Sequence, residues 1–281
     1  MLQINSNIPL ALGDLINIKA FIDPVKNQYS SIKLTFHRSL LEEGVKSNID
    51  GWLEKKQLWE KYLSDIGQLF FSESPYILDS GQHRFRDTMG IMQDFKIQPI
   101  KPELSHLLCK GTSLNLGKEY IVITTKVREM SRSTFYPLSI NLWKTLNKLS
   151  EKYKIVILGE RQVEMRREYK VLKDTVFSIY EQIISNIPND RILDLTLPAL
   201  GESVSSLSQI QQDCLIMNQA KLVITLGIGG NFVMSTAVSN MAIGFRNDNH
   251  SLAERVFNRE YPNAIITKDW NRFIRALEAY L

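Results

Sequence analysis

The chain has 281 residues, of which 44% are hydrophobic and 23% charged, and a formal net charge of +4. These values are typical of a globular protein with room for two domains, and the mild charge argues against a nucleic-acid-binding surface that covers the molecule. The two cysteines, Cys109 and Cys214, lie far apart and match no metal-ligand spacing, so with four scattered histidines we expect no zinc site. The sequence shows neither a secretory signal pattern nor an apolar stretch of membrane-spanning length, and we expect a cytoplasmic protein without a transmembrane segment.

The first third of the chain alternates short apolar runs with helical patterns. Residues 2–10 alternate between apolar and polar and predict a first strand, which a turn at Gly13-Asp14 and a helix to about Asn27 follow. Asp14 suits the start of this helix, as a cap or first-turn acid. The order strand, turn, helix, strand implies a parallel pair of strands. The other elements expected here are strands at 32–36, 68–71 and 76–78 and helices at 52–63 and around 82–93.

Residues 94–118 contain Pro99, Pro102 and Gly111 and show weak periodicity, which is typical of a connection between domains. Beyond them the alternation is clearer. We expect strands at 120–125, 154–158, 192–195, 222–226, 241–245 and 264–267, a polar loop at 126–136, and helices at 138–153, 169–186, 207–218, 231–240 and 269–281, the last one capped by Asp269.

The stretch 220–240 is the most informative part of the sequence. A short buried-strand pattern ends at Leu226, Gly227, Gly229 and Gly230 follow at once, and a helical pattern begins at Asn231. Glycines let a backbone approach a ligand closely, and the start of a helix offers unpaired N–H groups and the positive end of its dipole. The turn suits a phosphate or pyrophosphate; the alternative is a tight turn that binds nothing.

These patterns predict an α/β protein of two Rossmann-like domains, each with a parallel sheet, at residues 1–115 and 116–281. The final helix is a candidate to pack back on the first domain. In parallel sheets, ligands bind beyond the carboxyl ends of the strands. The loops that follow Ile8, Thr125, Leu158 and Leu226 are therefore expected to line one cleft between the domains.

Six segments, taken in order, resemble the heptosyltransferase-like enzymes of glycosyltransferase family 9. These are Leu12-Gly13-Asp14-Leu15, the run at 121–126, the helix with Trp143, the strand end at Leu158-Gly159-Glu160 with the later Leu193-Asp194-Leu195-Thr196, and the glycine loop at 225–231. The resemblance implies the GT-B fold, with the two domains facing across a cleft. The family usually has an Asp and a His in the last loop, which here reads Leu-Gly-Ile-Gly-Gly-Asn-Phe. This departure leaves the donor sugar, hexosyl or heptosyl, unspecified.

The resemblance implies a role for several residues. Asp14 stands where the family places the base that takes a proton from the acceptor hydroxyl; the alternative is a capping acid. By the same analogy, Glu160 and Arg161 would lie near the ribose or base of the nucleotide, the alternative being a surface ion pair.

The remaining candidates would hold the donor diphosphate. Lys126 and Arg128 lie on the loop that opens the second sheet, where cations suit a diphosphate, and the alternative is a solvated basic loop. Backbone N–H groups at Gly229, Gly230 and Asn231 would hold the same group. With such donors no metal or other cofactor is required.

The leading hypothesis is a glycosyltransferase, inverting and metal-independent, that moves a sugar from a nucleotide-sugar donor to a glycan or other hydroxyl acceptor. A nucleic-acid acceptor stays open but is not favoured. The alternatives are a sugar-nucleotide epimerase or hydrolase of the same fold, or a non-catalytic nucleotide- or partner-binding protein. The missing Asp and His in the last glycine loop favour the non-catalytic alternative.

Overall fold

The computed structural model describes residues 2–6, 12–37, 49–72, 84–85, 100–125, 132–159, 179–196, 207–226, 230–245 and 258–281. Residue contacts divide the chain into two units. The first comprises residues 1–102 with 204–207, and the second comprises 103–203 with 208–281. Each unit contains one sheet in which every pair of neighbouring strands is parallel, so the predicted α/β class with two parallel sheets is confirmed.

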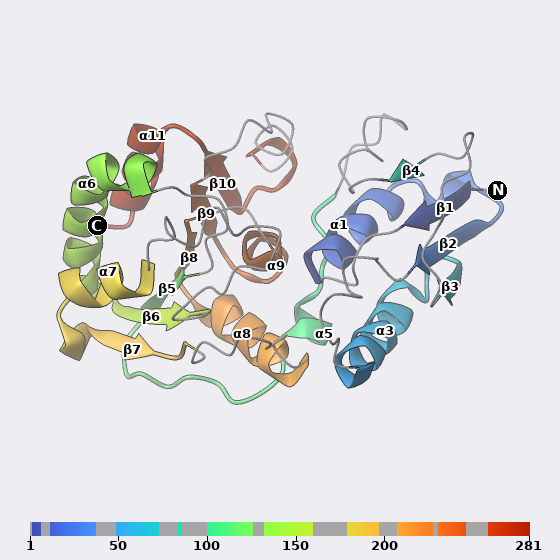
Figure 1. Cartoon of the computed structure of the whole chain (residues 1–281), viewed down its shortest axis with the longest axis horizontal. Coiled ribbons are helices and arrows are strands. Elements are labelled where there is room, and N and C mark those ends of the chain that lie inside the picture. Colours follow the sequence, from blue (N-terminus) through green and yellow to red (C-terminus); the bar gives the residue numbers. More distant parts are fainter. Residues whose placement is uncertain are drawn as a thin grey trace. The chain divides into compact units, whose positions relative to one another are not determined.

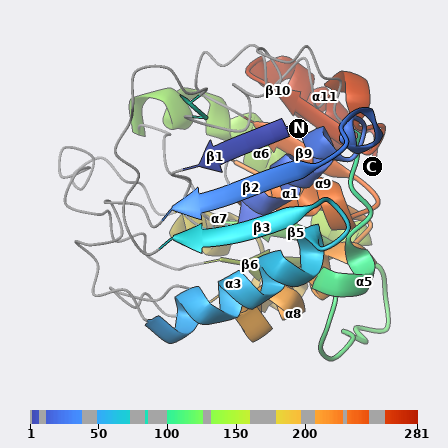
Figure 2. The same cartoon turned by 90° about the vertical axis from the view of Figure 1, so that its right-hand side faces the viewer.

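The sheet of the first unit has the order β3-β2-β1-β4. Its strands β1, β2 and β3 point the same way in Figure 2. Three of these strands match the predicted runs, but the fourth lies inside the helix predicted at 82–93, which is wrong at these two residues. The elements are β1 (Leu2–Ser6), α1 (Leu12–Ile22), η1 (Lys26–Gln28), β2 (Ile32–His37), α3 (Ile49–Leu63), β3 (Gln68–Ser72) and β4 (Arg84–Phe85).

Helix α1 includes Gly13 and Asp14, so the turn predicted at these residues is wrong, and the helix ends at Ile22 rather than near Asn27. Its apolar side chains from Leu15 to Ile22 are buried, Phe21 among them. Helix α1 packs against α3, so these apolar residues lie inside a core. Burial of this helix in the core overrides the glycine that otherwise favours a turn.

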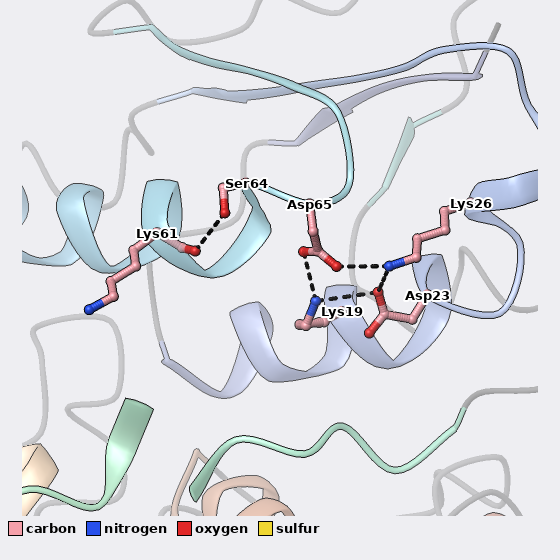
Figure 3. A network of polar contacts seen from close by, with 6 residues as sticks. All are labelled: Lys19, Asp23, Lys26, Lys61, Ser64 and Asp65. Atoms are coloured by element: carbon pink, nitrogen blue, oxygen red, sulfur yellow. Dashed lines mark hydrogen bonds and ion pairs between the residues drawn. The ribbon is translucent and has the colours of Figure 1, made fainter. Parts of the chain in front are cut away.

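Four charged residues join the end of α1 to the loop that follows α3 (Figure 3). The ammonium of Lys19 lies 3.0 Å from Asp65 and 3.3 Å from Asp23, and that of Lys26 lies 2.8 Å from Asp65. Burial alone would raise the pKa of Asp65, but hydrogen bonds from Lys26 and Lys19 outweigh it and hold that pKa below its usual value. The network therefore keeps the half-buried Lys19 charge paired where α1 enters the core.

The sheet of the second unit has the order β10-β9-β8-β5-β6-β7. Every described strand falls within a predicted run. Helix α6 begins at Arg132, inside the predicted polar loop, so that loop is wrong from 132 onward. The elements are α5 (Ser105–Leu108), β5 (Tyr120–Thr124), α6 (Arg132–Lys152), β6 (Lys154–Leu158), α7 (Ile179–Asn186), η3 (Asn189–Arg191), β7 (Ile192–Asp194), α8 (Leu207–Gln219), β8 (Leu222–Thr225), α9 (Gly230–Val238), β9 (Ala242–Phe245), β10 (Ala264–Thr267) and α11 (Trp270–Glu278).

Helices cover both faces of this second sheet (Figure 1). On one face, α6, α7 and α11 pack over a core that includes Ile123, Ile224 and Phe245. The indole of Trp270 stands edge-on to the ring of Phe245, with 4.5 Å between centroids. Helices α8 and α9 lie over the other face. The last helix thus packs on α6, β9 and β10 of its own unit.

The segment that leads into β5 is bound along α8 by side-chain amides. The Gln212 amide accepts a 2.9 Å hydrogen bond from the Thr112 N–H and donates a 2.8 Å bond to the Thr112 carbonyl. Gly111 has a φ of +129°, and a Cβ added there would lie 2.0 Å from the Gln212 Oε1. Only glycine therefore allows this close approach.

Candidate functional site

The order of the second sheet places a topological switch point between β5 and β8. From β5 the chain proceeds outward through β6 to β7, and then returns to β8 and continues outward through β9 to β10 on the other side. Successive connections therefore pass over opposite faces at this one position. In open parallel sheets, ligands bind beyond the carboxyl ends of the strands at such a point.

Three threonines lie at the carboxyl ends of these two central strands: Thr124 and Thr125 at β5 and Thr225 at β8. The N–H of Thr125 donates to the Leu158 carbonyl at 2.9 Å, and its hydroxyl donates to the same oxygen at 3.3 Å. Thr125 therefore ties the end of β5 to the end of β6.

Thr124 and Thr225 differ from Thr125. They are register partners across the switch point, so their side chains lie on the same face of the sheet. Each residue is 1% exposed, and each hydroxyl has no hydrogen-bond partner within the described part of the chain. A buried polar group without a partner costs about 1–3 kcal/mol, so two of them side by side need an explanation.

Helix α9 begins beside this pair. Thr225 pairs with Gly244 of β9, and a Cβ built at Gly244 would lie 3.1 Å from the Thr225 hydroxyl oxygen. The same Cβ would lie 2.7 Å from two ring carbons of Phe232, the third residue of α9. The Thr225 hydroxyl therefore lies on the face of the sheet that the Phe232 ring of α9 covers.

The ends of the next two strands form turns. Gly159 follows β6 with a φ of +108°, which favours glycine, and the chain bends there just before Glu160. At the end of β7, the Asp194 carboxylate accepts hydrogen bonds from the Thr196 N–H at 2.9 Å and from the Tyr180 hydroxyl at 2.8 Å. In the Asp-Leu-Thr segment, Asp194 thus holds a turn.

Of the predicted site residues, the structure places three. Asp14 is the third residue of α1, Gly230 is the first residue of α9 and Asn231 the second; the side chains of Asp14 and Asn231 lie outside the described residues. Lys126, Arg128, Glu160, Arg161 and Gly229 also lie outside the described residues. Gly230 and Asn231 open α9, which follows the central strand β8, and their role as N–H donors stays a prediction.

The sequence reasoning did not select Thr124 and Thr225 as site residues. A signal was present, because each threonine ends an otherwise apolar strand pattern. Only the register, which sets these two residues opposite each other, distinguishes them from other strand-ending threonines such as Thr267.

Among the described residues, no group of three or more His, Cys, Asp or Glu side chains is placed to hold a metal ion. Within that same part of the chain, no helix is long and apolar enough to cross a membrane.

Comparison with solved structures places this architecture among known folds. The chain is similar over its whole length to a family 9 glycosyltransferase from Veillonella parvula, with 10% identity, 92% of that chain covered and a TM-score of 0.50. It is equally similar to the heptosyltransferase WaaC of Escherichia coli with ADP, with 8% identity, 100% of both chains covered and a TM-score of 0.50. The protein has the GT-B fold.

The predicted resemblance is thereby confirmed at the level of fold. No protein-family model matches the sequence, and no curated protein matches it. In this GT-B protein, Phe232, the last residue of the loop sequence Leu-Gly-Ile-Gly-Gly-Asn-Phe, is 0% exposed and packs over Gly244. That position supplies a core contact.

Proposed function

We propose that the protein is a glycosyltransferase that moves a sugar from a nucleotide-sugar donor to an acceptor hydroxyl. The observation that carries this proposal is the GT-B fold over the whole chain, with a ligand-type switch point in the second sheet and a helix that starts beside it. One of the two neighbours was solved with ADP, which makes ADP-sugars the first donors to test.

The proposed reaction is a single displacement at the anomeric carbon. The Asp14 carboxylate takes the proton of the acceptor hydroxyl as its oxygen forms a bond to that carbon. The bond from the carbon to the diphosphate oxygen breaks, and its electron pair leaves with the nucleoside diphosphate. The configuration at the carbon is inverted.

The departing diphosphate needs stabilisation of its negative charge. Backbone N–H groups at Gly229, Gly230 and Asn231, at the positive end of α9, are suited to this, together with Lys126 and Arg128. Glu160 and Arg161 would contact the ribose or base. Because these donors neutralise the phosphates, the proposed reaction needs no metal and should proceed in EDTA.

Calorimetric titration with ADP, UDP, GDP and their sugars tests the proposal. We expect at least one to bind with a micromolar dissociation constant. Asp14→Asn should keep this donor affinity and lose turnover by about 100-fold or more, the scale of one general base. Asp23→Asn, just beyond the other end of α1, is the matched control and should keep turnover. If no nucleotide or nucleotide sugar binds the wild-type protein, the proposal is wrong.

A second candidate is a non-catalytic nucleotide-binding protein of the same fold. The observation that favours it is the last glycine loop, which lacks the Asp and the His that family 9 usually has there. The same experiment separates the two functions: a binder takes up the nucleotide, but neither the wild-type protein nor Asp14→Asn releases free nucleoside diphosphate from any donor with any acceptor. Release that does not depend on an acceptor would instead favour an epimerase or hydrolase.

A further inference from the structure

The two cysteines of the chain, Cys109 and Cys214, are neighbours in the folded second unit although they are 105 positions apart in the sequence. The Cys109 thiol donates a 3.4 Å hydrogen bond to the Cys214 carbonyl oxygen. Since the sulfur and the carbonyl oxygen of one cysteine lie at most about 4.7 Å apart, the two sulfurs lie within about 8 Å of each other. The chain has no third cysteine, so within one molecule each thiol can form a disulfide only with the other.

The backbones that carry the two cysteines also lie in contact. Cys109 is the C-cap of α5, and Cys214 lies inside α8, the neighbouring helix (Figure 1). Before Cys109, the Leu107 carbonyl accepts a 3.2 Å hydrogen bond from the Gln211 side chain. After it, the Lys110 N–H donates a 3.3 Å bond to the Gln211 carbonyl, one turn of α8 before Cys214. A disulfide joins Cα atoms about 4.4–6.8 Å apart, and backbones in hydrogen-bond contact approach that spacing.

The hydrogen bond between the two residues does not account for a thiol at position 109. A thiol is a weak donor, and a carbonyl inside an α-helix already accepts the N–H of the residue four positions further on. Cys214 lies inside α8, so its carbonyl does not need Cys109 as a partner. Two adjacent thiols, unlike a thiol and a carbonyl, have a chemistry of their own, because they can be oxidised to a disulfide.

The two thiols differ in their access to solvent. The Cys109 side chain is partly exposed, whereas Cys214 is 0% exposed. Burial raises the pKa of both thiols, and a hydrogen bond with Ser105 opposes only part of this rise at Cys109. The neighbouring Asp213 charge raises the pKa of Cys214 further. Because the thiolate is the reactive form, reaction is slow at neutral pH, and a dissolved oxidant reaches Cys109 first.

We infer that Cys109 and Cys214 are a site of reversible disulfide formation, with Cys109 as the residue that meets the oxidant and Cys214 as its internal partner. The oxidant is a small-molecule disulfide such as glutathione disulfide. The Cys109 thiol loses its proton to water and attacks one sulfur of the oxidant, and one glutathione leaves as a thiolate. The Cys214 thiol then loses its proton and attacks the Cys109 sulfur, so the second glutathione leaves and the protein disulfide forms. Two protein thiols are thus oxidised while one glutathione disulfide is reduced to two glutathione molecules.

The bond would connect two places where the chain enters the second unit. This unit begins at Glu103, two residues before α5, and it takes up the chain again at Ser208, because residues 204–207 belong to the first unit. Since the loop between the cysteines spans 105 positions, closing it removes conformational entropy from the unfolded chain and should stabilise the fold. The inference does not rest on the proposed function.

Oxidation of the reduced protein with glutathione disulfide at about pH 8.5 tests the inference. We expect a product whose mass is lower by two hydrogen atoms, and one cross-linked pair of peptides that contains Cys109 and Cys214. The oxidised protein should unfold at a higher urea concentration than the reduced protein, and dithiothreitol should reverse both changes. In glutathione redox buffers, the disulfide should resist reduction at least about tenfold more in the folded protein than in concentrated urea, because the fold already holds the sulfurs close.

Two variants assign the two roles. Cys214→Ala should stop at the mixed disulfide, with one glutathione attached to Cys109. Cys109→Ser is the matched control: its folded form should take up no glutathione, and the oxidant should leave its urea midpoint unchanged. The measurements on the wild-type protein decide the inference by themselves where Cys214→Ala, a change in the core, fails to fold.

Several results would overturn the inference. One is a folded wild-type protein that does not react, that keeps glutathione on Cys109 without forming the internal bond, or that forms bonds only between molecules. Another is a disulfide that is no harder to reduce in the folded protein than in urea. An oxidised protein that is less stable than the reduced one would show that the fold does not accommodate the bond.

Discussion

Asp213, in the middle of α8, carries a carboxyl group whose pKa is raised. Burial raises its pKa from 3.8 to about 6, and a 2.8 Å hydrogen bond from the Gln209 amide opposes only part of this effect. Within the described part of the chain, no lysine or arginine pairs with it. The neighbouring Cys214 thiol is fully buried and has a pKa well above its usual value, so it stays neutral.

The sign of the pH effect follows from the raised pKa. Between about pH 4 and pH 6 the folded protein holds a proton on Asp213 that the unfolded chain has lost, so the free energy of unfolding falls as pH rises through this window. A shift of about two pH units corresponds to about 3 kcal/mol, at about 1.4 kcal/mol per unit. Asp213→Asn removes this charge and keeps an oxygen to accept from Gln209. The variant should therefore be more stable than the wild-type protein at pH 7, by up to about 3 kcal/mol, and equally stable below pH 4.

Urea unfolding followed by tryptophan fluorescence at pH 4, 5, 6 and 7 measures the effect. We expect the difference between variant and wild type to grow between pH 4 and pH 6 and then to stay constant. Asp190→Asn, which changes an exposed carboxylate in η3, is the control and should show little pH-dependent difference. A constant difference at all four pH values, or a destabilised variant at pH 7, would refute the reasoning.

Two further predictions concern the ends of helices. Asp65→Asn removes the acceptor shared by Lys19 and Lys26 and should lower the free energy of unfolding by about 1 kcal/mol or less. This loss should shrink at high salt, and also as pH falls through the lowered pKa of Asp65. Urea unfolding at two salt concentrations and at several pH values measures both effects. Asp269→Ala removes the cap that accepts hydrogen bonds from the first N–H groups of α11, at 2.9 and 3.1 Å, and should lower stability by about 1 kcal/mol, measured at neutral pH by the same method; an unchanged urea midpoint would contradict it.

The sheets could largely be predicted from the sequence. Short apolar runs with β-branched residues, such as those at β5, β6 and β8, are recognisable because strands buried on both faces must be apolar at every position. The cap at Asp269 could also be predicted, because its signal is local. The strand order β10-β9-β8-β5-β6-β7 agrees with the predicted Rossmann-like halves.

The wrong predictions of secondary structure lie where contacts with the rest of the protein outweigh the local preference of the sequence. Gly13 and Asp14 favour a turn, but burial of the helix in the core keeps them in α1. Arg84 and Phe85 lie in a helical pattern, but they pair with β1 and extend the first sheet. In each case a contact distant in sequence overrides a pattern of a few residues.

In the candidate site too, local signals could be recognised in the sequence, whereas contacts between distant residues could not. Glycines and charged residues in loops stand out in a sequence, so Gly230 and Asn231 could be selected before the structure was known. Thr124 and Thr225 are 101 positions apart in the sequence, and only the register of β5 and β8 brings them next to each other. No local pattern contains that register, so strand-to-strand pairing had to be seen first.

In the proposed donor site, the groups that would bind the phosphates differ from the residues that would contact the sugar. Backbone N–H groups at the start of α9 are suited to phosphate whatever sugar follows. The last loop, where family 9 usually has an Asp and a His, here reads Leu-Gly-Ile-Gly-Gly-Asn-Phe, and the Phe232 ring is buried over Gly244. Under the proposed function, this departure would change contacts to the sugar and leave the backbone phosphate donors in place. We therefore expect nucleotide affinity to depend on the diphosphate far more than on the sugar, so that ADP and an ADP-sugar bind this protein within a few-fold of each other.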